Sequence, residues 1–474
     1  MSIPEIIAYL DGLVWGLPAI ITLVCAGIVV AIFGGFYQIR KFPLAFKTFI
    51  RYKGERGKGE VSPFKIWAAV TGATVGIGNI AGASTAIHLG GAGALFWMWI
   101  CAIFGMGLKG VEVVLALWSR KVLPDGRVEG GTPYYIRLLP GIGPALALFF
   151  AICLILNCYG SNNFVQANNV ALGVEYVVKE FFGEDPGIIF QARLIVGIIM
   201  AVLVALVVLG GVRRIAEFAN YIVPFMATWY IVFGLGVLVA YAKYIPLALS
   251  EVFTYAFTPQ AAAGGLAGWT VFHAIRWGFA RGLFSNEAGA GSAPNGYAYM
   301  TVDHPGRAAM YGIMEVFLDT IVICSITCLT VLTSRVYIEE PELTAAPLVM
   351  EAFKRVYGSW APLILGISLT LFALTTMLTW EWYGEVNWRY FFVRTLKLPE
   401  KPMIWLWRIL WVIPIIPCAV TPELFKFYWD FADLCYGLEA IPNLVAVIYL
   451  SPVALKLIKD FYSRHVYETG EVAK

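Results

Sequence analysis

One apolar segment, interrupted by four glycines and an asparagine, most constrains the fold of this chain. Residues 64–89 are long enough to cross a membrane, and they contain the run Thr71-Gly72-Ala73-Thr74-Val75-Gly76-Ile77-Gly78-Asn79-Ile80-Ala81-Gly82. A continuous helix disfavours such a run, because each glycine costs roughly 1 kcal/mol of helix propensity relative to alanine. Irregular backbone inside a bilayer is tolerated only where protein or a water-filled cavity satisfies its polar groups. The segment therefore predicts a helix that is opened at its centre.

An opened helix offers two kinds of polar backbone group at one place. The N–H groups that begin one half suit a carboxylate, and the C=O groups that end the other half suit a sodium ion. The alternative is that the glycines only allow close helix packing in lipid. Packing explains Gly72, Gly76 and Gly82 but not Asn79, so we expect a substrate site here. Gly76-x-Gly78 is not a dinucleotide fingerprint, since no strand precedes it.

The composition is that of an integral membrane protein. Hydrophobic residues make up 59% of the 474 residues and charged residues only 14%. With roughly 20 apolar residues for each crossing, the all-α chain has about eleven predicted spans. They lie near residues 12–36, 63–89, 92–119, 136–165, 189–210, 214–242, 268–290, 308–333, 360–388, 403–421 and 424–458.

The loops between these spans differ in charge. Basic residues gather in the first interhelical loop, in every second loop after it and in the C-terminal tail; the opposite loops hold acids such as Glu180, Glu184, Glu339 and Glu340. Cytoplasmic loops carry the excess of Lys and Arg. We therefore expect a multi-pass protein of the plasma (cell) membrane, with the N-terminus outside and the C-terminus cytoplasmic. This bias explains the basic loops without nucleic acid.

A second broken span predicts an internal repeat. The second and seventh spans are both interrupted by glycine, and they lie five spans apart, so they cross in opposite directions, as an inverted repeat requires. The predicted organisation has an extra N-terminal helix with a basic loop, a first five-helix repeat, an extracellular connection, a second five-helix repeat and a cytoplasmic tail: residues 1–62, 63–242, 243–267, 268–458 and 459–474.

Four blocks of sequence resemble the alanine or glycine:cation symporter family, of the sodium:alanine symporter type. They are the run from Thr71 to Gly82, Gly90-Gly91-Ala92-Gly93-Ala94-Leu95-Phe96-Trp97-Met98-Trp99 with Gly105-Met106, Arg281-Gly282-Leu283-Phe284-Ser285-Asn286-Glu287-Ala288-Gly289, and Trp380-x-x-Tyr383-Gly384-Glu385. Ala440-Ile441-Pro442-Asn443-Leu444 extends the resemblance to nearly the whole chain. Ile77 and Ala92 depart from the family pattern, and Ile77 could narrow a pocket.

The resemblance implies a LeuT-like fold of five plus five inverted helices with the first span as an addition. It also implies sodium-coupled, or in some members proton-coupled, uptake of alanine or glycine by alternating access. Backbone N–H groups near Ile77, Gly78 and Asn79 would bind the substrate carboxylate. By analogy with the family, Gln166 adds a side-chain partner, although its Asn/Gln-rich run could instead edge an extracellular loop. Trp380, Thr376, Ile275 and Phe279 would complete a small pocket.

The ninth span looks like the sodium-binding helix of this fold. A hard cation takes oxygen ligands, and the hydroxyls of Thr375 and Thr376 with the carbonyl of Phe372 supply three. The carbonyls of Gly72 and Val75 on the opened second span would make five. The alternative is that both threonines bond back to their own helix.

Charged residues inside spans need partners, since each costs roughly 2.5–3.5 kcal/mol at the bilayer centre. Lys109 and Glu112 are three apart and are predicted to pair. Arg281 and Glu287 flank the predicted break of the seventh span and could form an inner gate. His88 and His273 are candidate proton carriers, with a structural role as the more usual finding. No role is predicted for Asp319, Glu315, Asp430 or Asp433.

Other function classes fit less well. A proton-driven carrier of the same fold would replace the sodium ion with a titrating carboxylate or histidine. A channel would need a continuous polar stripe, and an intramembrane enzyme a nucleophile with a base or a metal cluster, neither of which the chain shows. The expected partners are Na⁺ or H⁺, a small amino acid and the lipid bilayer, with no organic cofactor. The choice between glycine, L-alanine and D-alanine, and the oligomeric state, stay open.

Overall fold

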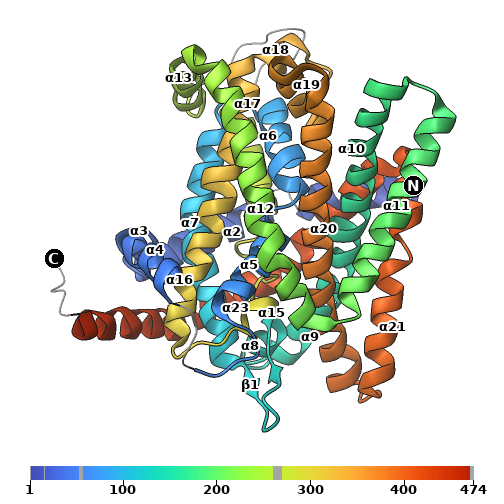
Figure 1. Ribbon diagram of the computed structural model, residues 1–474. Helices are drawn as coiled ribbons and strands as arrows, with labels where there is room; N and C mark the ends of the chain where they lie inside the picture. The colour runs from blue at the N-terminus through green and yellow to red at the C-terminus, as the bar shows by residue number, and fades with distance from the viewer. Residues whose placement is uncertain (1, 15–16, 53–56, 260–269, 470–474) are drawn as a thin grey trace.

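The computed structural model describes residues 2–14, 17–52, 57–259 and 270–469, and most of them are helical. Parts of the predicted basic loop (53–56), of the extracellular connection and seventh span (260–269) and of the tail (470–474) lie outside the described residues. Helices dominate because a helix satisfies its own backbone hydrogen bonds, which lipid cannot do. Figure 1 shows most of the long helices side by side in one bundle.

The N-terminal region carries four helices before the first broken span. They are α1 (Ile3–Val14), α2 (Leu17–Phe33), α3 (Tyr37–Arg40) and α4 (Phe42–Arg51).

The region predicted as the first repeat follows, and its helices are joined once by a short hairpin of β1 (Lys121–Val122) and β2 (Val128–Glu129). The helices are α5 (Pro63–Thr74), η1 (Gly78–Gly82), α6 (Ala83–Gly90), α7 (Ala94–Ser119), α8 (Thr132–Ile136), α9 (Gly143–Tyr159), η2 (Gly160–Phe164), α10 (Val165–Phe182), α11 (Pro186–Val208) and α12 (Gly211–Ala240).

The connection contains η3 (Ala242–Tyr244) and α13 (Ile245–Tyr255). The remaining helices are α14 (Val271–Asn286), α15 (Pro294–Tyr297), α16 (Pro305–Val316), η4 (Phe317–Cys324), α17 (Ser325–Ser334), α18 (Val336–Glu339), α19 (Ala345–Tyr357), η5 (Gly358–Trp360), α20 (Ala361–Trp388), η6 (Arg389–Thr395), α21 (Glu400–Val412), α22 (Ile415–Val420), η7 (Pro422–Leu424) and α23 (Phe425–Thr469).

Among the described residues, eight helices are long and apolar enough to cross a membrane, and nine if the bent pair of α5 with residues 78–90 is one span. Helices also occupy the predicted first and seventh spans, but α2 and α14 have only 17 and 16 residues. The count of eleven spans and the repeat boundaries therefore stay predictions. The all-helical membrane architecture is confirmed.

Both predicted breaks are present. The two halves of the second span meet at Val75–Ile77 and are bent by 49°. The seventh span opens later than the sequence predicted: α14 is helical through Gly278 and Arg281 as far as Asn286, and the chain then leaves the helix at Glu287, which has a φ of 56°. Gly289 and Gly291 continue the opened stretch with φ values of 92° and 83°, a region that glycine adopts without strain.

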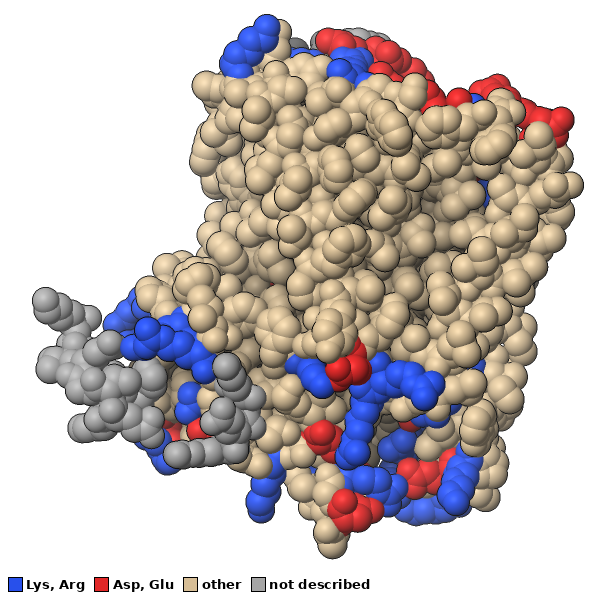
Figure 2. Space-filling view, viewed as in Figure 1, with Lys and Arg blue, Asp and Glu red and all other residues tan. Residues whose placement is uncertain are grey.

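The basic and acidic residues separate to opposite ends of the molecule. Figure 2 shows acidic residues concentrated at the end that carries α18 and α19, and most of the basic residues at the end that carries the β hairpin, with an apolar band between them. This arrangement agrees with the alternation of loop charge in the sequence. A bilayer would lie across the apolar band.

Candidate functional site

The break of the second span lies against α20 and α14, and its glycines allow this contact. A Cβ atom at Gly76 would stand 2.6 Å from the Thr376 hydroxyl of α20, and one at Gly78 would stand 3.2 Å from the Phe284 ring of α14. Asn79 stabilises the opened backbone, because its Oδ1 accepts the Gly76 N–H at 2.9 Å. The residues from Gly72 to Gly82 are all buried. The break is therefore an interior feature at which three spans meet.

A buried carboxylate joins the two broken spans. Asp319 of η4 accepts the Asn79 amide at 2.6 Å through Oδ1 and the Ser285 hydroxyl of α14 at 2.9 Å through Oδ2. The Thr320 hydroxyl also donates to Oδ2, at 2.7 Å. Asp319 is fully buried, and its charged neighbour is Glu315 rather than a basic residue. Among the described residues no salt bridge includes Asp319, so its partners beside the break are the amide of Asn79 and the hydroxyls of Ser285 and Thr320.

The predicted sodium ligands lie where α20 meets the end of α5. The Thr376 hydroxyl lies 3.1 Å from the Gly72 carbonyl and 3.2 Å from the Ala73 carbonyl, so it crosses between the helices. The Thr375 hydroxyl instead lies 3.1 Å from the carbonyls of Leu371 and Phe372 in its own helix. A Cβ at Gly72 would lie 3.0 Å from the Cβ of Thr375. The structure brings together Gly72, Thr375 and Thr376, and Val75 follows as the residue that caps α5.

Trp380 connects α20 to the break of the seventh span. Its indole Nε1–H donates to Glu287 Oε1 at 3.0 Å, and the Ser292 hydroxyl donates to Glu287 Oε2 at 2.5 Å. Glu287 and Arg281, which the sequence suggested for an inner-gate network, have separate partners in this structure, and the gate stays a prediction. Arg281 binds Asp433 of α23 instead, at 3.1 Å.

The other predicted pocket residues have contacts of their own. Gln166 donates to the Ser161 carbonyl at 3.0 Å, and its buried Oε1 has no hydrogen-bond partner. Phe279 packs against Trp97 of α7, with ring centroids 6.1 Å apart, and Ile275 is half-buried one turn earlier on α14. The structure gives these three residues no hydrogen bond or ring contact with Gly78 or Asn79. Their place in the pocket stays a prediction.

The predicted pairing of Lys109 with Glu112 was wrong. Lys109 of α7 forms a fully buried ion pair with Glu315 of α16 at 3.0 Å. Glu315 also accepts the hydroxyls of Thr74, at 2.7 Å, and Tyr297, at 2.8 Å. Thr74 ends α5, and Tyr297 follows the break of the seventh span. The ion pair therefore links the two broken spans to α7 and α16.

Glu112 satisfies the opened backbone of the seventh span. Its two oxygens accept the N–H groups of Gly289 and Gly291, at 3.2 Å and 3.1 Å, and the amide of Asn443 in α23 at 2.5 Å. Unpaired backbone groups are costly away from water. A carboxylate with two acceptor oxygens thus takes over hydrogen bonding that the helix no longer provides.

Sequence reasoning did not predict the roles of Asp319, Glu112 and Glu315. Most of their partners lie more than 100 positions away in the chain, although Ser285 and Tyr297 are nearer. The available signal was an ionisable residue within a span, which is by default a functional candidate. His273, in contrast, joins Thr270 in a capping box at the start of α14, which is the structural role expected of it.

Comparisons with known proteins agree with this architecture. Residues 1–473 match the model of the family described as "Sodium:alanine symporter family". The chain is 38% identical to the sodium/alanine symporter AgcS of Methanococcus maripaludis, over 97% of this chain and 98% of that protein. It is 33% identical to the probable sodium/glutamine symporter GlnT of Bacillus subtilis, over 96% and 90% of the two chains.

A solved structure supports the fold independently of close sequence similarity. The crystal structure of MhsT in complex with L-phenylalanine superposes with a TM-score of 0.55 at 13% identity, covering 85% of this chain and 99% of that one. A likeness at this identity concerns the fold alone, and it confirms the LeuT-like architecture.

Proposed function

The chain belongs to the sodium:alanine symporter family, and we propose on this premise that it imports alanine or glycine together with Na⁺ by alternating access. Membership makes it a multi-pass, sodium-coupled amino-acid transporter rather than an enzyme. The observation that carries the finer proposal is the contact of Thr376 with the Gly72 carbonyl at the opened end of α5. This contact places a hydroxyl of α20 beside the bare carbonyls of a broken helix.

The substrate carboxylate would bind the backbone N–H groups at Ile77, Gly78 and Asn79, where the second half of the broken span begins. The Asn79 N–H donates to the Gly76 carbonyl at 3.1 Å in this structure, so it would have to exchange that bond for the carboxylate. The first N–H groups of a helix have no partner within it, and the positive end of the helix dipole favours an anion. The substrate ammonium needs acceptors, and Asp319 adds a negative charge on the far side of Asn79. Gln166 offers its unpartnered Oε1 as a further acceptor.

The sodium ion would bind the carbonyls of Gly72, Val75 and Phe372 and the hydroxyls of Thr375 and Thr376. These are the oxygen ligands that a hard cation takes. The Thr376 hydroxyl and the Gly72 carbonyl are already 3.1 Å apart, so both oxygens can approach one ion when the hydroxyl proton turns away. The donor set fits Na⁺.

Substrate size would be set by Trp380, Ile77, Ile275 and Phe279. Trp380 and Ile77 are both buried in the interior, where their bulky side chains would limit the size of a substrate side chain. The name of GlnT assigns glutamine to a relative. Transport of glutamine by this chain would therefore revise the proposed preference for alanine or glycine. Competition between alanine, glycine and glutamine for labelled alanine uptake distinguishes them.

A proton-coupled cycle is the second candidate, and Glu439 favours it. This α23 residue is fully buried beside Asn157, neither carboxylate oxygen has a hydrogen-bond partner of normal geometry, and its charged neighbour is Glu287. A carboxylate buried without a cation tends to be neutralised by a proton. Glu439→Gln should then abolish uptake driven by a proton gradient while leaving uptake driven by sodium unchanged.

The deciding experiment is uptake of labelled alanine into proteoliposomes under an inward sodium gradient and, separately, under a proton gradient. Sodium-driven accumulation that stops when K⁺ replaces Na⁺ is the expected result. Accumulation under the proton gradient alone would transfer the coupling role to Glu439 or Asp319. Accumulation under neither gradient would overturn the alanine and glycine assignment.

The proposed orientation has the basic end in the cytoplasm of the cell and the N-terminus outside. It is supported by the separation of charge in Figure 2. We expect activity from a reporter that functions only in the cytoplasm and is fused after Lys474. Protease added to intact cells should not cleave this reporter.

A further inference from the structure

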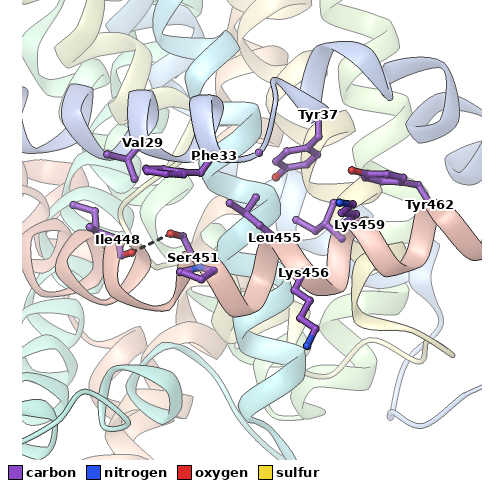
Figure 3. A pocket seen from close by; sticks show the side chains of 12 residues that line it. Val29, Phe33, Tyr37, Ile448, Ser451, Leu455, Lys456, Lys459 and Tyr462 are labelled. Carbon is purple, nitrogen blue, oxygen red and sulfur yellow. Dashed lines mark hydrogen bonds between the residues drawn. The ribbon is translucent and has the colours of Figure 1, made fainter. Parts of the chain in front are cut away.

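A groove on the outer surface of the bundle runs between α2 and α23 (Figure 3). Its volume is about 640 Å³, within the range of roughly 300–1,000 Å³ that small-molecule sites occupy. Gly34 ends the α2 side of the groove and permits the close approach of α23, because a Cβ there would lie 3.1 Å from Leu455. This groove is separate from the candidate transport site.

The two ends of the groove differ in chemistry. Val29, Phe33 and Ile448 line one end and are apolar, whereas Tyr37, Lys459 and Tyr462 lie at the other end (Figure 3). The side chain of Lys456 also belongs to the lining, although it points away from α2 in this view. The groove therefore has an apolar length and a basic end.

The positive charge at the basic end is not neutralised within the described residues. Asp460 is the acidic residue of this stretch of α23, and it is bound by His304 at 3.0 Å and by Arg464 at 2.9 Å. No salt bridge in the described part of the chain includes Lys456 or Lys459. Lys41 adds a third ammonium group, which lies 4.9 Å from the ring centroid of Tyr462. The basic end is suited to an anion.

The apolar length opens onto surface that faces lipid tails in the proposed placement. Ile32 and Phe33 are 61% and 76% exposed, which is expected of an α2 face in contact with the bilayer. In Figure 1 the C-terminal part of α23 lies in the half of the molecule that carries the β hairpin, which is the basic end in Figure 2. In the proposed placement this half faces the cytoplasmic leaflet. A basic pocket between helices on the cytoplasmic side binds the head group of an anionic lipid.

We propose that this groove binds one anionic phospholipid, with an acyl chain along Val29, Phe33 and Leu455 and the phosphate at Lys459, joined by Lys456 when its flexible side chain turns toward α2. The proposal rests on the membrane placement given under the proposed function and not on the identity of the transported amino acid. A soluble phosphate would satisfy the lysines but leave the apolar length empty. A neutral phospholipid would fill the groove but leave the lysines uncompensated.

The test is native mass spectrometry of the full chain, delipidated in detergent and titrated with phosphatidylglycerol or phosphatidylcholine. The wild type should bind one phosphatidylglycerol in preference to phosphatidylcholine. The double variant Lys456→Ala/Lys459→Ala should weaken phosphatidylglycerol binding by roughly 30-fold, since each lysine near an anionic lipid surface contributes about fivefold. Val29→Trp should also weaken binding by obstructing the apolar length without changing the charge.

The matched control is Lys121→Ala/Lys397→Ala, which removes two exposed lysines of the same molecule outside the groove and should bind as the wild type does. Equal binding by the wild type and the groove variant would overturn the proposal. Displacement of the lipid by an equal concentration of glycerol 3-phosphate would also overturn it, because the site would then recognise a soluble phosphate alone. Alanine uptake is measured separately, so failure of the lipid site and failure of the proposed transport can be told apart.

Discussion

Thr375 and Thr376 are adjacent on α20, yet their hydroxyls have different partners. Thr375 bonds to carbonyls of its own helix, the usual behaviour of a threonine inside a helix. Thr376 reaches the Gly72 carbonyl across the interface with α5. At the scale of single residues, a hydroxyl that leaves its own helix for the carbonyls of a broken one is the better candidate for a sodium ligand. Thr375 would have to rotate to contribute.

Thr376→Ala should raise the sodium concentration for half-maximal uptake by roughly tenfold or more. A hydrogen-bond-type contact with a charged group contributes about 1.5–3 kcal/mol, and 1.4 kcal/mol corresponds to tenfold in affinity. Thr376→Ser keeps the hydroxyl and should behave as the wild type. The control is Thr379→Ala, whose hydroxyl also crosses to α5, donating to the Ala69 carbonyl at 2.9 Å, but outside the proposed site. Equal sodium curves for the alanine variants at 376 and 379 would contradict the assignment.

Asp319→Asn should lower the affinity for alanine, because it removes the negative charge beside Asn79 while keeping nearly the same shape. The expected loss is about tenfold or more, as for a hydrogen bond to a charged group. Binding of labelled alanine to purified protein measures it, and an unchanged melting temperature shows that the variant is folded. Asp430→Asn, which removes a carboxylate paired with Lys426 at 2.5 Å, is the control. Unchanged alanine affinity would assign Asp319 a structural role.

At the scale of elements, the sequence predicted which spans break but not how the breaks are held. Glycine runs and a buried asparagine are local signals, so the opening near Gly76, and the presence of a break in the seventh span, could be read from the chain itself. The place of the second break, from Glu287 to Gly291, could not. The partners of the opened backbone are set by packing, and Glu112 and Gly291 are 179 positions apart. Packing also explains why the predicted partner of Lys109 was wrong. Glu112 is three positions away in the chain, but the fold brings Glu315 to Lys109 instead.

Glu112→Gln should destabilise the folded protein and abolish transport. The glutamine side chain offers one acceptor oxygen in place of two and turns an NH₂ group toward the N–H of Gly289 or Gly291. A buried donor left without an acceptor costs about 1–3 kcal/mol. The melting temperature in detergent should fall by several degrees. Glu184→Gln, at an exposed position, is the control and should leave it unchanged. A Glu112→Gln variant as stable and active as the wild type would remove Glu112 from the support of the break.

At the scale of the whole molecule, the two ends are held by different ion pairs. Glu400 at the start of α21 lies 3.8 Å from Arg127, 3.5 Å from Arg389 and 3.9 Å from Arg394, so it connects the β hairpin with η6 and α21. Arg355 at the acidic end binds Glu339 and Glu351. The charge bias of the loops predicted these two ends. It could not predict the pairs, because they depend on which loops fold against each other.

Alternating access requires one end to open while the other stays closed, and the Glu400 network joins segments of the two predicted repeats. Glu129→Gln/Glu400→Gln removes both carboxylates that bind Arg394, at the hairpin and at the start of α21. Partly exposed ion pairs contribute about 0.5 kcal/mol each, so losing two of them, about 1 kcal/mol in all, should raise the open population roughly fivefold. Hydrogen–deuterium exchange should then quicken in residues 121–129 and 396–408, and not in residues 336–357. Glu339→Gln should produce the reverse pattern, with faster exchange in residues 336–357 only. If both variants quicken exchange at both ends, the ion pairs stabilise the fold in general and do not close one end of the transport path.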